Sequence, residues 1–298
     1  MQAVKSVKVT TIVDNLVYDG RLLGQHGYSA HVEVTDTKGE KHSIVFDSGS
    51  KKGATLHNVK MLKLDLTPVE AVVLSHGHYD HTSSTVELIK QAKRRVKVVV
   101  HPKVFFKRFI LRQQKRRCLG IPQGQGKSDM QEAGADVVET TRPIEILPGV
   151  LTSGEIRRVV PFEKMNWKVK MINNGKTTMD NVPDDQALFV NVERHGLLVL
   201  TGCAHAGIVN TIQHALDSVK PRKLYGFIGG THLVGCKENR LKETMKRFED
   251  FDMRLISPAH CTGFKATSAL SQAFPRSFVL NYAGRTIDTA KRMKDAVF

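Results

Sequence analysis

Residues 69–81 read VEAVVLSHGHYDH, an apolar run that ends in a cluster of imidazole and carboxyl groups. The run AVVL predicts a buried strand, and the potential metal ligands that follow it are His76, His78, Asp80 and His81. Alternate residues at a strand end project to one side, and the turn beyond brings the last two ligands to the same point. Neutral imidazoles with one carboxylate suit zinc, manganese, iron, cobalt or nickel, so this segment predicts a divalent-metal site.

The pattern His-x-His-x-Asp-His after a buried strand resembles the metallo-β-lactamase superfamily. The resemblance implies an α/β fold, a four-layer αβ/βα sandwich formed by a single domain over residues 1–298. It also implies six side chains that bind one or two metal ions. These are His76, His78 and His205 for the first position, and Asp80, His81 and His260 for the second.

Acidic residues near the ligands match positions that the resemblance assigns to orienting the metal site from behind the ligands. Asp47 lies in FDSGS, and Asp185 is favoured over Asp184 in PDDQALFV. His26 lies in the glycine-containing loop LLGQHGYS, where it either contacts substrate or is an ordinary loop residue.

One position departs from the family pattern, because the family usually supplies a bridging aspartate between its last two histidines. Here the corresponding strand end reads FIGGTHL and offers Thr231 and His232 but no acid. Three alternatives stay open: His232 is itself a ligand, solvent alone bridges the two ions, or one position is weak. As a non-ligand, His232 is a candidate catalytic residue that donates a proton or hydrogen bond to the leaving group.

The leading functional hypothesis is hydrolysis of ester-type bonds, with phosphate esters ahead of lactones. A divalent metal lowers the pKa of bound water and so produces hydroxide near neutral pH. In this hypothesis Asp80 is also catalytic, since it holds the second ion and orients the nucleophile.

An alternative hypothesis comes from four further segments, LTGCAHAGIVN, PDDQALFV, IGGTHL and PAHCTGF. Together they resemble the subgroup that contains a dihydropterin-dependent ribofuranosylaminobenzene phosphate synthase. In a synthase the metal would bind the diphosphate leaving group of a dihydropterin diphosphate and would activate no water. A nucleic-acid-processing or nucleic-acid-binding protein is the third alternative.

The 298-residue chain carries a net charge of +16. A positive field attracts anions, so we expect a phosphate-bearing small-molecule substrate, with nucleic acid possible but not favoured in the absence of a dedicated motif. Four cysteines without a C-x-x-C pair indicate a reduced, cytoplasmic protein. Cys203 and Cys261 flank presumed ligands, where small buried packing is favoured over binding a soft metal.

A basic segment interrupts the domain at about residues 103–130. Residues 103–118 read KVFFKRFILRQQKRRC, which we interpret as a helix with a basic face, followed by the loop IPQGQGKSD. This helix is either a solvated surface element, a cap that attracts phosphate groups towards the metals, or part of a nucleic-acid groove.

Overall fold

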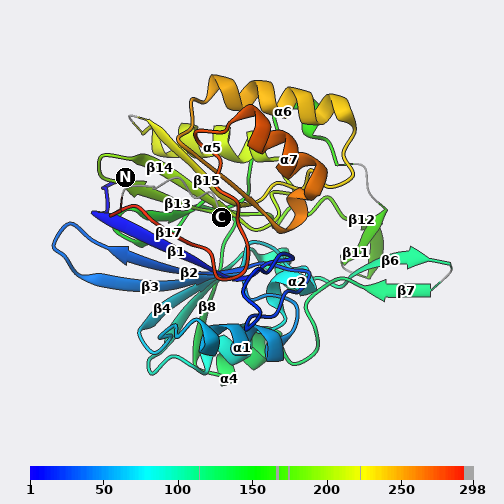
Figure 1. The fold of residues 1–298 in the computed structure, drawn as a ribbon. Helices are drawn as coiled ribbons and strands as arrows, with labels where there is room; N and C mark the ends of the chain where they lie inside the picture. Colours follow the sequence, from blue (N-terminus) through cyan, green and yellow to red (C-terminus); the bar gives the residue numbers. More distant parts are fainter. Residues whose placement is uncertain (114, 166–167, 174, 222, 292–298) are drawn as a thin grey trace.

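Two sheets packed face to face form the centre of the molecule, with helices on both outer faces (Figure 1). The computed structural model describes residues 1–291 apart from residues 114, 166, 167, 174 and 222. The first sheet has the order β17-β1-β2-β3-β4-β5-β8. Its strands are β17 (Thr286–Asp288), β1 (Ser6–Val13), β2 (Ser29–Thr35), β3 (Lys41–Phe46), β4 (Val69–Val73), β5 (Val96–Val100) and β8 (Ala135–Glu139).

The second sheet has the order β16-β15-β14-β13-β10-β9. Its strands are β16 (Leu255–Ala259), β15 (Leu224–Gly230), β14 (Gly196–Thr201), β13 (Ala187–Val192), β10 (Val150–Thr152) and β9 (Glu145–Leu147). Short 3-10 turns lie at Pro102–Phe105, Pro161–Glu163 and His260–Thr262.

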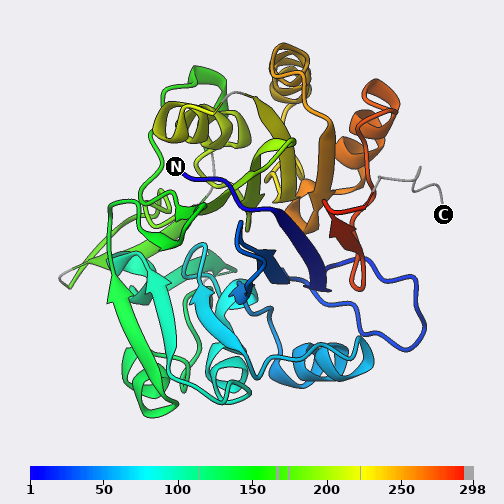
Figure 2. The same ribbon diagram turned by 90° about the vertical axis from the view of Figure 1, so that its left-hand side faces the viewer.

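Helices cover the outer face of each sheet, as Figure 2 shows from the side. Those on the first sheet are α1 (Lys52–Met61), α3 (Thr85–Ile89) and α4 (Lys127–Glu132), while the single turn α2 (Tyr79–Thr82) follows the end of β4 and carries Asp80 and His81. Those on the second sheet are α5 (Ile208–Val219), α6 (Glu238–Asp250) and α7 (Phe264–Ala273). No helix in the described part of the chain is long and apolar enough to cross a membrane.

Three apolar layers hold this arrangement together. The middle layer joins the inner faces of both sheets, with Val32 and Phe46 from the first and Leu198 from the second among its buried members. Separate layers lie between the second sheet and helices α5–α7 and between the first sheet and helices α1, α3 and α4. Each sheet therefore buries both faces, which confirms the four-layer αβ/βα sandwich of the metallo-β-lactamase type.

The helix expected at residues 103–118 is wrong. After a 3-10 turn, the chain forms a hairpin of β6 (Arg108–Arg112) and β7 (Lys115–Cys118), which extends away from the sandwich (Figure 1). This hairpin joins β11 (Val169–Asn173) and β12 (Lys176–Met179) in a third sheet of order β12-β11-β6-β7. Pairing with β11 satisfies the backbone of β6, so tertiary context overrides the helical composition of the segment.

The topology brings the sequence-distant ligands together. Strands β3, β4 and β5 run parallel in the first sheet, and β14, β15 and β16 run parallel in the second. Parallel strands end at the same edge of their sheet, and the candidate ligands follow these ends. The loop 76–81 follows β4, while His205, His232 and His260 follow β14, β15 and β16 respectively.

Candidate metal centre

Three buried histidines form the first candidate metal position. His76 Nε2 lies 3.2 Å from His205 Nε2, and one ring nitrogen of His78 lies within 4.8 Å of ligand atoms of both. The three rings meet edge to face, with centroids 4.5 to 4.9 Å apart. Burial is the main cause that lowers the pKa of His76 and His205 well below the ordinary value, which keeps both imidazoles neutral and able to coordinate a cation.

The second candidate position is centred on the carboxylate of Asp80. Its Oδ2 lies 3.3 Å from His260 Nε2 and 3.7 Å from His81 Nε2. His26 Nε2 lies 3.3 Å from the same oxygen, although the His26 side chain is 60% exposed. The loop histidine therefore contacts this position, and His26, Asp80 and His260 form one group of potential ligand atoms within 4.8 Å of one another.

Hydrogen bonds behind the ligands fix which ring nitrogen faces the centre. Nδ1 of His81 lies 2.7 Å from Asp47 Oδ2, and Nδ1 of His76 lies 2.9 Å from Ser75 Oγ. Nδ1 of His260 lies 2.8 Å from Asn15 Oδ1. In each case Nε2 is left for the centre, as in metal sites whose outer partners orient the histidine ligands.

Asp47 contacts both ends of the loop, Ser75 before His76 and the ring of His81. Its Oδ1 accepts from the Ser75 backbone N–H at 2.7 Å, and its Oδ2 accepts from the Ser75 hydroxyl at 2.7 Å. Burial by itself lowers the pKa of His81, but the Asp47 and Asp80 carboxylates outweigh burial and raise the pKa to about 9. A divalent ion at this position would replace the proton on His81.

An ionic group that the sequence does not reveal lies beneath the HGHYDH loop, residues 76–81. Arg108, 1% exposed at the start of β6, donates to Asp184 Oδ1 and, at 2.8 Å, to Asp180 Oδ2. Asp184 Oδ2 accepts from the Gly77 backbone N–H at 2.8 Å. A Cβ at Gly77 would lie 2.1 Å from Val104 O, so only glycine allows the loop to pack this closely. The third sheet therefore supports the HGHYDH loop from below.

Asp184 and Asp185 have separate contacts, although the family resemblance favoured Asp185 over Asp184 for orienting the site. Asp185 Oδ2 accepts from the Ala206 backbone N–H at 2.7 Å, next to His205, while Asp184 contacts the loop 76–81. Burial raises the pKa of Asp185 to about 7, since only part of that penalty is offset by the backbone N–H. Both acids therefore position ligand-bearing segments, one on each side of the centre.

The turns of the second sheet place their histidines through an uncommon backbone conformation. His232 and His260 have φ angles of 48° and 46°, and Ala204, beside His205, has a φ of 54°. Such angles are uncommon in non-glycine residues and are often found at functional sites. One contact at these turns, also missed from the sequence, is Asp14 Oδ2, which accepts from the His260 N–H at 2.9 Å.

His232 lies beside the first position. Its ring centroid is 4.4 Å from that of His205, and its backbone N–H donates to Cys261 Sγ at 3.3 Å. Burial lowers the pKa of His232 to about 4, so its imidazole is neutral near pH 7. Thr231, at the position of the missing acid, donates its hydroxyl hydrogen to Thr262 Oγ1 at 3.0 Å.

The sandwich and the histidine-rich centre at its strand ends define a member of the metallo-β-lactamase superfamily, and the chain belongs to that superfamily. A model described as a beta-lactamase superfamily domain matches residues 42–108. The crystal structure of Tm1679, described as a metal-dependent hydrolase of the beta-lactamase superfamily, superposes with a TM-score of 0.77 over 94% of this chain and 98% of that one, at 22% identity. Zn²⁺-bound PqqB from Methylobacterium extorquens gives a TM-score of 0.54 over 94% and 99%, at 10% identity.

Within the superfamily, the chain resembles two proteins of Methanocaldococcus jannaschii along almost its whole length. It is 30% identical to the 7,8-dihydropterin-6-methyl-4-(β-D-ribofuranosyl)-aminobenzene-5′-phosphate synthase over 95% of this chain and 97% of the synthase. It is also 30% identical to the uncharacterized protein MJ0448 over 94% of this chain and 99% of that protein. The chain is therefore a divalent-metal enzyme of the branch that contains this synthase.

The full-length similarity to a synthase contradicts our leading expectation of a hydrolase that acts on ester-type bonds. The structural similarity to Tm1679, at 22% identity, shows the fold alone. The error has a physical cause, because the HGHYDH motif specifies a metal site and leaves open what the metal acts on. The same cation can activate water or neutralise a leaving group.

Proposed function

We propose that this enzyme is a synthase that joins a dihydropterin diphosphate to a ribosylated aminobenzene phosphate, the reaction type of its M. jannaschii relative. The observation that carries the proposal is the 30% identity to that synthase over 95% of the chain. Two features of the structure, a cationic pocket and a cationic hairpin beside the metal centre, support a substrate that carries phosphate groups.

A pocket of about 360 Å³ opens next to the first metal position. His232 lines it, and the ring of His232 packs on His205. Its remaining lining residues are Phe162, Lys164, Met165, Val234, Gly235, Cys236, Lys237 and Arg240. The described lining thus combines three cations with apolar side chains and has no acid, a composition suited to a phosphate group on an aromatic or heterocyclic body.

The β6–β7 hairpin brings further positive charge to the other side of the centre. Arg117 Nη2 donates to the Tyr79 hydroxyl at 3.2 Å, and the Tyr79 backbone N–H donates to Leu119 O at 2.9 Å. Tyr79 stands between the ligands His78 and Asp80, so the Arg117 end of β7 lies close to the HGHYDH loop. The proposal keeps the phosphate-attracting role, one of the three alternatives for this basic segment, and assigns it to a hairpin in place of a helix.

The ligands we propose are the six of the two candidate positions, since their nitrogen and oxygen donors converge and suit zinc. They are His76, His78 and His205 for the first ion and Asp80, His81 and His260 for the second. Bound there, the cation neutralises negative charge on the diphosphate. In this reaction Asp80 acts only as a ligand of the second ion, and it orients no water for attack.

The bond changes are those of a substitution at carbon. The aminobenzene nitrogen attacks the methylene carbon that carries the diphosphate, a carbon–nitrogen bond forms, and the carbon–oxygen bond breaks. Diphosphate leaves with the electron pair, and the nitrogen loses its proton to solvent. His232, neutral because burial lowers its pKa to about 4, donates a hydrogen bond to the departing diphosphate, while Lys237 and Arg240 hold the phosphate end of the substrate.

The direct test incubates zinc-loaded protein with a dihydropterin diphosphate and the ribosylated aminobenzene phosphate, and measures coupled product and released diphosphate by mass spectrometry. We expect equal amounts of both, dependent on the acceptor. Release of diphosphate without coupled product would refute the proposal.

Substitutions in the pocket test the proposed phosphate contacts. Lys237→Ala and Arg240→Ala should each raise KM about 10- to 100-fold, the size of a lost charge-assisted hydrogen bond. Lys242→Ala, an exposed cation on the same helix, is the matched control.

A further inference from the structure

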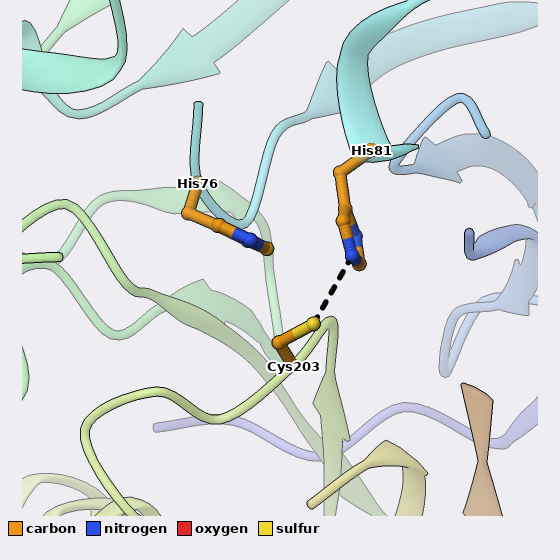
Figure 3. A group of neighbouring side chains, drawn as sticks. All are labelled: His76, His81 and Cys203. Carbon is orange, nitrogen blue, oxygen red and sulfur yellow. Dashed lines mark hydrogen bonds between the residues drawn. The ribbon is translucent and has the colours of Figure 1, made fainter. Parts of the chain in front are cut away.

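A buried cysteine lies between the two candidate metal positions. Cys203 follows β14, two residues before His205, and its Sγ lies 3.2 Å from His81 Nε2. Figure 3 shows the side chains of His76, His81 and Cys203 converging on one point. The ligand atoms of these three residues all lie within 4.8 Å of one another.

The same sulfur also belongs to the other side of the centre. Cys203, His260 and Cys261 form a second group of potential ligand atoms within 4.8 Å of one another. His76 belongs to the first position, whereas His81 and His260 belong to the second. The Cys203 sulfur therefore reaches ligands of both positions, which is the relationship that a bridging group requires.

The spacing matches coordination by one cation. Zinc lies about 2.3 Å from a thiolate sulfur and about 2.0–2.1 Å from an imidazole nitrogen, so a sulfur and a nitrogen on one ion are at most about 4.4 Å apart. The 3.2 Å between Cys203 Sγ and His81 Nε2 falls inside this limit. The sulfur faces a histidine nitrogen whose ring Asp47 aligns, a contact that apolar packing does not require.

We propose that Cys203 is a metal ligand that replaces the bridging aspartate of the family and joins the two ions. The position of that aspartate is filled by Thr231, whose hydroxyl is directed to Thr262. The inference rests on the ligand set proposed above, and it does not depend on the reaction proposed above. It also favours zinc or another ion that accepts sulfur over manganese.

Cys261 has a different place and supplies the matched control. Its Sγ donates to the Cys203 backbone carbonyl at 3.5 Å and accepts from the His232 N–H at 3.3 Å. Although Cys261 belongs to the group with Cys203 and His260, both hydrogen bonds of its sulfur engage backbone groups of two turns, so we assign it the role of positioning these turns. A hydroxyl at this position can still donate and accept, and Cys261→Ser should therefore retain the metal centre.

The test loads metal-free protein with Co²⁺ and records sulfur-to-cobalt charge-transfer absorption in the near ultraviolet, while mass spectrometry counts the ions. Wild-type protein and Cys261→Ser should show the band and two ions. Cys203→Ser should lose the band and bind the metal at least about 10-fold more weakly, since loss of a ligand costs no less than loss of a partner that orients one. Cys118→Ser and Cys236→Ser control for adventitious binding at the other two thiols.

A band that persists in Cys203→Ser, or that disappears in Cys261→Ser alone, overturns the inference. If mass spectrometry counts only one ion in wild-type protein, the bridging role of Cys203 is refuted. If Cys203→Ser does not fold, X-ray absorption at the zinc edge of wild-type protein decides instead, and the absence of a sulfur neighbour refutes the assignment. A positive band without coupled product would refute the proposed reaction alone, so the two failures are distinguishable.

Discussion

The two sides of the metal centre obtain their ligands in different ways. The first sheet supplies His76, His78, Asp80 and His81 from one loop after β4, and Asp47 and Asp184 hold that loop through its backbone and side chains. The second sheet supplies one histidine from each of three separate turns, whose backbone is left-handed at or next to each histidine. The first side is thus one contiguous segment held at several points, whereas the second consists of three separate turns in which a left-handed residue accompanies each histidine; on the first side the left-handed residue is Asp47, outside the ligand loop.

The largest effect should come from removing the ionic support of the first side. Arg108→Ala leaves Asp180 and Asp184 buried without their cation, and breaking a buried pair costs about 3–5 kcal/mol in the free energy of unfolding. Urea unfolding measures this loss. Lys115→Ala, an exposed cation on the same hairpin, should change stability by less than about 0.5 kcal/mol. Equal effects from the two substitutions would show that Arg108 does not support the loop.

Metal removal should increase amide hydrogen exchange more on the second side of the centre than on the first. A ligand at 100 times its Kd stabilises the folded state by about 2.7 kcal/mol, and chelation removes that stabilisation. We expect amide hydrogen exchange to accelerate up to about 100-fold at the turns 204–207, 231–233 and 259–262, because their strained backbone relaxes. The loop 76–81 should accelerate less, since protein groups still hold it. Equal acceleration on both sides would contradict the comparison.

The smallest effect should come from His26. His26 Nε2 and His260 Nε2 both lie 3.3 Å from Asp80 Oδ2, but the His26 side chain is 60% exposed and that of His260 is 1% exposed. An exposed pair is worth about 0–1 kcal/mol, so His26→Ala should weaken metal binding less than about fivefold. His260→Ala should weaken it far more in the same titration. Similar losses would make His26 a full ligand of the second position.

The same contrast explains how much the sequence reveals. The HGHYDH loop is contiguous, so its metal-binding character and the fold that it implies are readable from one segment. His205 and His260 emerge only through family resemblance, because no local pattern reports that two distant strand ends share an edge with β4. The structure brings His205 beside His76 and His260 beside Asp80.

The supporting residues could not be predicted, because their partners are set by tertiary structure. Arg108 reads as one more cation in a basic segment, yet it is buried against Asp180 and Asp184, more than 70 residues away. Asp14 likewise looks like an ordinary loop acid, and only the packing of β1 beside the His260 turn reveals its contact. The helix expected at 103–118 failed for the same reason, since the partner strand β11 lies far along the chain.

The position of β7 has a further consequence. It is an edge strand, with the backbone groups of one side unpaired in the third sheet, and such edges readily recruit strands from other molecules. Lys115, Arg116 and Arg117 are consecutive and exposed along this edge, so we expect their charges to oppose pairing of two hairpins from different copies. The charges that we propose attract phosphate would therefore also oppose self-association through this edge.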